Sequence, residues 1–168
     1  MKSRSLTLFL ACAGMLFVAG TVNAQTDVKA MVVKHLTVSR DFTLKVAEQM
    51  PEADYGFKLT PPQMSFAAQM VHLADDQAVT LEPLLGKPAA PSKPASMNKK
   101  DVIAHVRQAF DRTIAGVSAL TPAQINNSSG TMTGLERLIF VLDHTTHHRA
   151  SAEMYLRAKG ITPVEYEF

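Results

Sequence analysis

A helical pattern runs through LERLIFVLDHTTHHRASAEMYLRAK, residues 135–159. Apolar positions recur in it at steps of three and four residues, the period of an α-helix that buries one face. The expected core face consists of Leu135, Leu138, Ile139, Leu142, Thr146 and Leu156. A second face, about half a turn away, is chemically mixed and consists of Arg137, Val141, His144, His148, Ser151 and Tyr155. Such a helix is expected to pack on a core with one face and to line a cleft with the other.

Three further amphipathic patterns precede this helix, at residues 27–50, 63–85 and 98–119. Pro51 and Gly86 are expected to end the first two, and Asn98 is suited to cap the third. No segment shows the two-residue alternation of a convincing strand. The sequence therefore predicts an all-α protein, a four-helix bundle. The connectors after the second and third helices are long enough to cross the bundle, so the order of helix directions stays open.

The first 24 residues have the composition of a signal peptide. Lys2 and Arg4 precede a short apolar run at residues 6–18, and the small residues of VNA end at Ala24, where a signal peptidase is expected to cleave. The run is too short to cross a membrane as a helix. Cleavage there predicts a periplasmic or secreted protein that is not held at a membrane. The alternative is a lipoprotein attached through Cys12.

The remaining chain, residues 25–168, has the length of a single domain. Loss of the first 24 residues removes Lys2 and Arg4, which leaves 15 basic residues against 15 acidic ones. A domain without net charge or a basic stripe is not expected to bind nucleic acid. The one cysteine, Cys12, would leave with the signal peptide. The mature chain would then have no disulfide and no thiolate, and a metal ion would need His, Asp or Glu ligands.

Two of the six histidines, His144 and His148, are four residues apart. On a helix this spacing places both imidazoles on one face, where they can reach the same metal ion. The glutamate of an H-E-x-x-H motif is missing, because Thr145 follows His144, so the zincin class is excluded. The alternative interpretation is a group of exposed histidines near the C-terminal half of a helix, where the helix dipole tolerates positive charge.

The candidate for a third ligand is His72, which lies in the second helix. Asp76 follows one turn later and is expected to accept a hydrogen bond from the non-ligating ring nitrogen of His72, which would fix the tautomer of His72. Because His72 lies away from the expected core face of its helix, both side chains could instead face solvent. Of the other histidines, His35 is expected at the edge of the first helix and His105 on the solvent side of the third.

Two stretches of the sequence resemble the DinB/YfiT-like superfamily. HTTHHRAS at residues 144–151, followed by MYLR and GITP, is similar to the family's C-terminal motif H-x-x-H-H-R-G-Q, Y-L-R and G-x-x-P. SFA at residues 65–67 and MVHLA at residues 70–74 are similar to the histidine segment of the family's second helix. The sequence departs from the motif at Ala150 and Ser151, where the family often has Gly and Gln. The missing Gln removes a polar side chain that the motif would place beside a metal.

This resemblance implies a metal-binding four-helix bundle, often a homodimer, that holds a divalent ion through His72, His144 and His148. His147 matches a family position that is often histidine but is not usually a ligand. Three neutral imidazoles leave at least one coordination position open, and such a site suits Zn, Ni, Cu or ferrous Fe.

Ser151 and Tyr155 follow His148 by one and two turns. Both are weak catalytic candidates that could hydrogen-bond a species held at the open position, or they could simply pack the helix. The family includes possible hydrolases and thiol-type transferases, so the resemblance implies a metal-dependent enzyme acting on a small-molecule substrate. Export favours hydrolysis, because low-molecular-weight thiols are kept inside the cell. The alternatives are a non-catalytic periplasmic metal-binding or stress-related module, and a helical scaffold whose histidines bind nothing.

Overall fold

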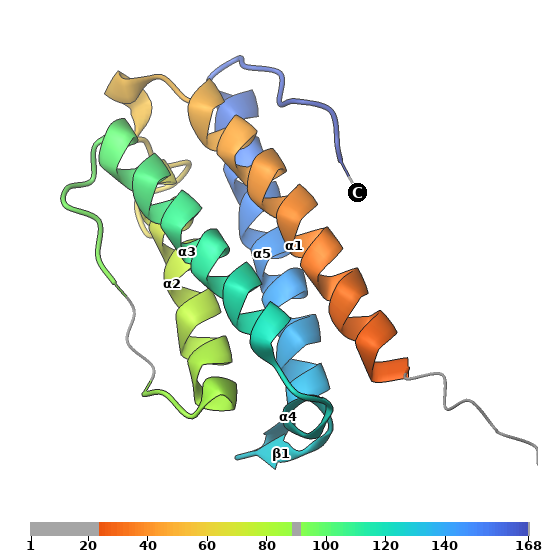
Figure 1. Ribbon diagram of the computed structural model, residues 1–168. Coiled ribbons are helices and arrows are strands. Elements are labelled where there is room, and N and C mark those ends of the chain that lie inside the picture. Colours follow the sequence, from red (N-terminus) through yellow and green to blue (C-terminus); the bar gives the residue numbers. More distant parts are fainter. Residues whose placement is uncertain (1–23, 89–91, 168) are drawn as a thin grey trace, which may run out of the picture.

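The computed structural model describes residues 24–88 and 92–167, so the predicted signal peptide lies outside the described residues except for Ala24. Four long helices form a bundle: α1 (Ala24–Gln49), α2 (Phe66–Leu81), α3 (Lys99–Ala119) and α5 (Gly134–Ala158) (Figure 1). The prediction of an all-α fold is confirmed. Within the described part of the chain, no helix combines the length and apolar character needed to cross a membrane.

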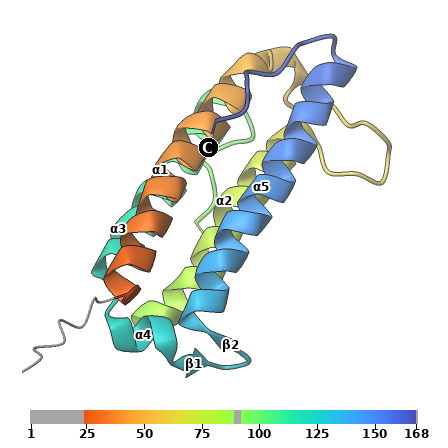
Figure 2. The same ribbon diagram turned by 90° about the vertical axis from the view of Figure 1, so that its right-hand side faces the viewer.

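Short elements join the long helices. Single 3-10 turns follow α1 at Glu52–Asp54 and α2 at Glu82–Leu85. The segment between α3 and α5, expected to be a loop, contains a short helix and a two-stranded antiparallel ladder: α4 (Pro122–Asn126), β1 (Ser128–Ser129) and β2 (Met132–Thr133). These elements turn the chain at one end of the bundle (Figure 2).

The connector after α2 is the one that crosses the bundle. Lys99, at the start of α3, donates through Nζ to the carbonyls of Glu48 and Met50 at the end of α1, so α1 and α3 are antiparallel. At the other end, Lys29 Nζ donates to the carbonyl of Leu120. Figure 1 shows that α2 and α3 run in the same direction, so α3 begins at the opposite end of the bundle from the end of α2.

Packing contacts give the arrangement of the four helices around the core. α2 packs on α3 and α5, and α1 also packs on α3 and α5. α1 and α2 are therefore diagonal to one another, although they are consecutive in the chain. The interior they enclose is apolar, and its largest fully buried side chains include Phe42, Phe66, Phe110, Leu36, Met70 and Leu138.

Side-chain caps explain where several helices begin. Ser65 accepts from the backbone N–H of Ala68 at the start of α2. Asn98 accepts from the N–H of Asp101 at the start of α3, which confirms the cap expected from the sequence. Thr133 and Glu136 form a reciprocal capping box on α5. Each cap satisfies backbone donors that the helix itself leaves unpaired.

The buried face of α5 differs from the predicted one. Leu138 and Leu156 are buried as expected, whereas Leu135, Ile139 and Thr146 are exposed. The side chains buried on the actual core face are mostly small or polar, and they include Val141, Thr145, Arg149 and Ala152. α5 lies against both α1 and α2, and small side chains allow this approach on two sides. Apolar residues occur around most of this helix, so their period alone indicated only part of the buried face.

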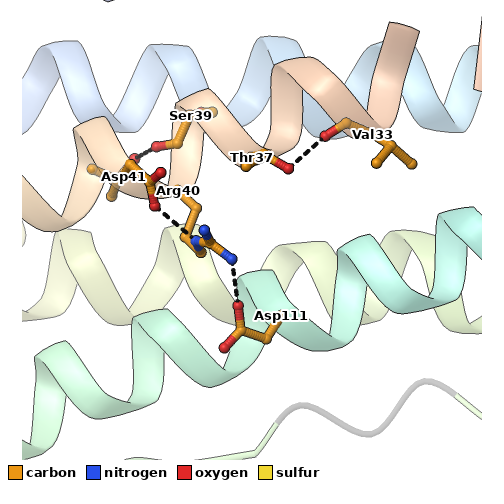
Figure 3. A network of polar contacts seen from close by, with 7 residues as sticks. Val33, Thr37, Ser39, Arg40, Asp41 and Asp111 are labelled. Carbon is orange, nitrogen blue, oxygen red and sulfur yellow. Dashed lines mark hydrogen bonds and ion pairs between the residues drawn. The ribbon is translucent and has the colours of Figure 1, made fainter. Parts of the chain in front are cut away.

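An ion-pair network on the surface joins α1 to α3. Arg40 donates through Nε to Asp41 and through Nη1 to Asp111, at 2.9 Å in each case (Figure 3). Both carboxylates are about half exposed, so solvent screens the pairs. Such exposed pairs each contribute at most about 1 kcal/mol, so the network adds little to the stability of the bundle.

Candidate metal centre

Three imidazole rings meet between α2 and α5. His72 comes from α2, and His144 and His148 come from consecutive turns of α5. The ring centroid of His72 lies 5.1 Å from that of His144 and 4.5 Å from that of His148. Each of the three side chains offers a nitrogen atom, and these nitrogens all lie within 4.8 Å of one another. The structure thus brings together the three side chains selected from the sequence, in a group that could hold a metal ion.

The Nε2 atoms of His144 and His148 face each other, and the Nδ1 atoms point away from the pair. The two Nε2 atoms are 3.1 Å apart. The other ring nitrogens point to oxygen acceptors: His148 Nδ1 lies 2.6 Å from Gln69 Oε1, and His144 Nδ1 lies 3.3 Å from Asp76 Oδ2. These acceptors favour the proton on Nδ1, which leaves a lone pair on each Nε2.

Two nitrogen lone pairs at this separation repel each other unless a cation lies between them. Zinc–imidazole bonds of about 2.0–2.1 Å in a tetrahedral site place neighbouring nitrogens about 3.4 Å apart. The separation of 3.1 Å between the two Nε2 atoms is close to this value. The spacing of this pair therefore fits a divalent ion, and His72 adds a third imidazole nitrogen within 4.8 Å of both.

Electrostatics keep the imidazoles of His144 and His148 in the form that coordinates metal. Burial, followed by the neighbouring histidines, lowers the pKa of His148 to about 4. Burial also lowers the pKa of His144, although the carboxylate of Asp76 acts in the opposite direction. Both rings are therefore neutral at pH 7, and neutral imidazole is the species that binds a metal ion.

The outer partners of the histidines differ from the prediction. Asp76 was expected to orient His72 on its own helix, but its carboxylate reaches across to His144 on α5. Gln69, which accepts from His148, was not predicted from the sequence. Gln69 lies three residues before His72, so both project from the same side of α2. A polar side chain in the otherwise apolar stretch SFAAQMVHLA was the available signal.

We expect Gln69→Leu to lower the affinity for a divalent metal by about 10–100-fold, the usual effect of losing an outer partner of a ligating histidine. The substitution removes the acceptor that holds His148 with its Nε2 toward the site. Competition with a chromophoric chelator measures this affinity. Gln108→Leu, at an exposed position of α3, is the matched control and should leave it unchanged. Equal affinities in the two variants would contradict the assigned role of Gln69.

The catalytic candidates from the sequence have other partners. The Tyr155 hydroxyl is buried and donates to the carbonyl of Met64 at 2.6 Å. The Ser151 hydroxyl donates to the carbonyl of His147 at 3.0 Å, within its own helix. The side chain of His147 is exposed and its ring lies edge-on to that of His148. An aromatic side chain also borders the three histidines: the Phe140 ring stacks on the His144 ring, with centroids 5.4 Å apart.

His105 is buried, and the prediction that it faces solvent was wrong. Its side chain is 3% exposed, and its Nε2 lies 2.9 Å from Asp75 Oδ1 on α2. The partner comes from a neighbouring helix, so the pattern of α3 alone could not reveal it. His35 is half-buried on α1, in agreement with the edge position expected for it.

We expect His105→Ala to lower the free energy of unfolding by about 1–3 kcal/mol, because it leaves the Asp75 carboxylate without its buried partner. Metal affinity should not change, since His105 does not contact the three converging histidines. Urea denaturation of metal-free protein measures the free energy of unfolding, and His147→Ala, at an exposed position, is the control. A loss of metal affinity in His105→Ala would show that the two regions are linked.

Comparisons with known proteins agree with this architecture. The sequence profile described as the DinB superfamily matches residues 35–152. A DinB-like protein from Bacillus subtilis, YjoA, superposes with a TM-score of 0.71 at 22% identity, covering 82% of this chain and 96% of that one. A DinB-like protein from Bacillus cereus gives a TM-score of 0.70 at 15% identity, covering 81% and 95%. No curated protein matches the sequence. The family profile covers most of the chain and both solved structures share its fold, so this protein belongs to the DinB superfamily.

Proposed function

We propose that this protein binds one divalent metal ion through His72, His144 and His148. The proposal rests on two Nε2 atoms 3.1 Å apart, on rings whose Nδ1 atoms each face an oxygen acceptor. A cation between them relieves their repulsion, and His72 lies close enough to complete the donor set. The imidazole set suits Zn, Ni, Cu or ferrous Fe.

We further propose that the protein acts on a small molecule, by hydrolysis or by a thiol-type transfer. When bound, the ion supplies Lewis acidity at a coordination position that three imidazoles leave open. The chain holds the three rings in place through Gln69 and Asp76. The His144 side chain is 18% exposed, so the site is accessible from solvent. Of the two reactions we favour hydrolysis, because the apolar N-terminal run suggests export away from cytosolic thiols.

Metal analysis of protein purified without an affinity tag tests the first step. The expected result is one equivalent of a transition metal per chain, released by a chelator and restored by titration. A metal content near zero, which stays near zero after titration with zinc, nickel, copper and ferrous iron, would refute the proposal. It would leave a helical scaffold with unused histidines.

A screen of ester and thiol substrates on the metal-loaded protein tests the second step. Turnover that disappears in His148→Ala and persists in His147→Ala supports an enzyme. The Ser151 and Tyr155 hydroxyls both donate hydrogen bonds to backbone carbonyls. This favours the second candidate function, a non-catalytic metal-binding module. Metal binding without turnover across the screen would select that module.

We also propose that the protein works as a homodimer in the periplasm or outside the cell. The support is the resemblance to a family that is often dimeric, together with the signal-like first 24 residues. Light scattering of the purified protein gives the mass in solution. Fractionation of cells that express the full chain gives its location, and N-terminal sequencing of the purified product shows whether cleavage follows Ala24.

A further inference from the structure

Arg149 is a buried cation on the side of α5 that faces α1. Although it follows His148 in the chain, its side chain is only 3% exposed and lies between α5 and α1. Its Nη1 donates to Ser39 Oγ at 2.7 Å, and its guanidinium carbon lies 4.4 Å from the centre of the Phe42 ring. These contacts hold the guanidinium plane in one orientation.

No carboxylate in the described residues, 24–88 and 92–167, pairs with Arg149 within ion-pair distance. Burial lowers the pKa of Arg149, and Tyr166 and Glu153 act in the opposite direction from further away. Within the same residues, only the Nη1 side has an acceptor, Ser39. A buried charge without a close partner is costly, so this arrangement is expected to have an anion as its complement.

A cavity of about 230 Å³ borders the guanidinium. Its polar lining includes Arg149, Ser39 and Tyr166, and its apolar lining includes Met31, Val38 and Leu142. Drug-sized ligands occupy about 300–1,000 Å³, so this cavity suits a smaller molecule. The C-terminal segment folds back beside α1 (Figure 2). From this segment Tyr166 and Glu167 line the cavity, and the Tyr166 ring lies edge-on to Phe42.

The cavity and the metal centre lie on different faces of α5. Leu142, Thr146 and Arg149 line the cavity, at steps of four and three residues. His144 and His148 project from the opposite side of the helix, because each residue advances about 100° around the axis. A ligand in the cavity would therefore not touch the imidazoles.

We propose that this cavity binds a small monocarboxylate with a short apolar chain. The Nε and Nη2 edge of Arg149 matches the two oxygens of a carboxylate. The Ser39 hydroxyl accepts from Nη1 and keeps its own proton for donation to the same group. The apolar chain lies against Met31, Val38 and Leu142. Two other titratable groups line the cavity, His35 and Glu167, and Glu167 is paired with Lys45.

Titration of metal-free, isotope-labelled full-length protein with butyrate, followed by ¹⁵N–¹H NMR, tests this site. The expected result is saturable shifts of amides near Ser39 and Tyr166, at millimolar butyrate or below, and no shifts with n-butylamine. Inorganic phosphate should bind more weakly, because it cannot use the apolar wall. Tighter binding of phosphate would overturn the carboxylate assignment, and absence of butyrate shifts would overturn the site.

Variants separate this cavity from the metal centre. Ser39→Ala should weaken butyrate binding about tenfold by removing a hydrogen bond to a charged group, while Ser118→Ala on the exposed face of α3 should not change it. Arg149→Gln should abolish binding, and its spectrum also reports whether the protein is folded. His148→Ala should bind butyrate normally. Unchanged affinity in Ser39→Ala together with lost affinity in His148→Ala would assign the anion to the histidine cluster instead.

Discussion

Replacing His148 by alanine is expected to lower the affinity for a divalent metal by more than about a hundredfold, beyond the effect of losing an outer partner. His148 would supply one of three coordinate bonds, and its Nε2 faces that of His144 directly. His144→Ala should have the same effect for the same reason. Isothermal titration of chelator-treated protein with zinc measures the loss, and circular dichroism should show nearly unchanged helix content.

His147→Ala is the matched control for this pair of substitutions. His147 lies on the same turn of α5, but its side chain is exposed and it does not belong to the converging group. Its replacement should leave the metal affinity within a factor of two or three. If His144→Ala, His148→Ala and His147→Ala all bound zinc as tightly as the parent protein, the three-histidine site would have to be abandoned.

The second large effect is expected from Gly134→Ala, at the first residue of α5. A methyl group there would meet the Gln124 carbonyl oxygen at 2.1 Å and the Ile125 Cα at 2.7 Å. Both are backbone atoms of α4, so the clash cannot be relieved by turning a side chain. We expect the free energy of unfolding to fall by about 3 kcal/mol, as for severe overpacking. Urea denaturation with metal-free protein measures this loss.

Gly56→Ala provides the comparison for Gly134→Ala. A methyl group at Gly56 meets nothing within 4 Å, and that residue does not adopt a positive φ. Its replacement should change stability by no more than a few tenths of a kcal/mol. If the two variants unfolded at the same urea concentration, α4 would have to move freely relative to α5, contrary to the close packing seen at Gly134.

The sequence predicts the four long helices well because their ends are marked by local chemistry. Pro51, Gly86 and Asn98 act within their own few residues, and the structure has helix ends close to all three. The helix directions are not local. Whether α3 runs with α2 or against it depends on contacts such as Lys99 with the end of α1, which join residues about 50 positions apart.

Burial was harder to predict than helix position. The core face of α5 includes Thr145 and Ala152, which carry little hydrophobic signal, while the larger Ile139 is 57% exposed. His105 was misplaced for a related reason, since a histidine becomes a core residue only when a neighbouring helix supplies an acceptor such as Asp75. Patterns along one helix do not contain that information.

The candidate site was partly visible in the sequence. The spacing of His144 and His148 follows from helix geometry alone. His72 was a candidate that could equally face solvent until the family resemblance favoured it, because two helices must meet to bring it near. The outer partners follow from that meeting as well. Asp76 extends to His144 and Gln69 to His148, and both contacts cross from α2 to α5, where no sequence period applies.

The parallel course of α2 and α3 leaves the protein with a natural place for insertions. α2 ends and α3 begins at opposite ends of the bundle (Figure 1), and Ala95, shortly before α3, is exposed. Each doubling of the length of a loop costs only about 0.6 kcal/mol in closure entropy. A fluorescent domain or an epitope placed after Ala95 is therefore expected to leave zinc affinity intact, which would allow the protein to be followed in cells with both termini unaltered.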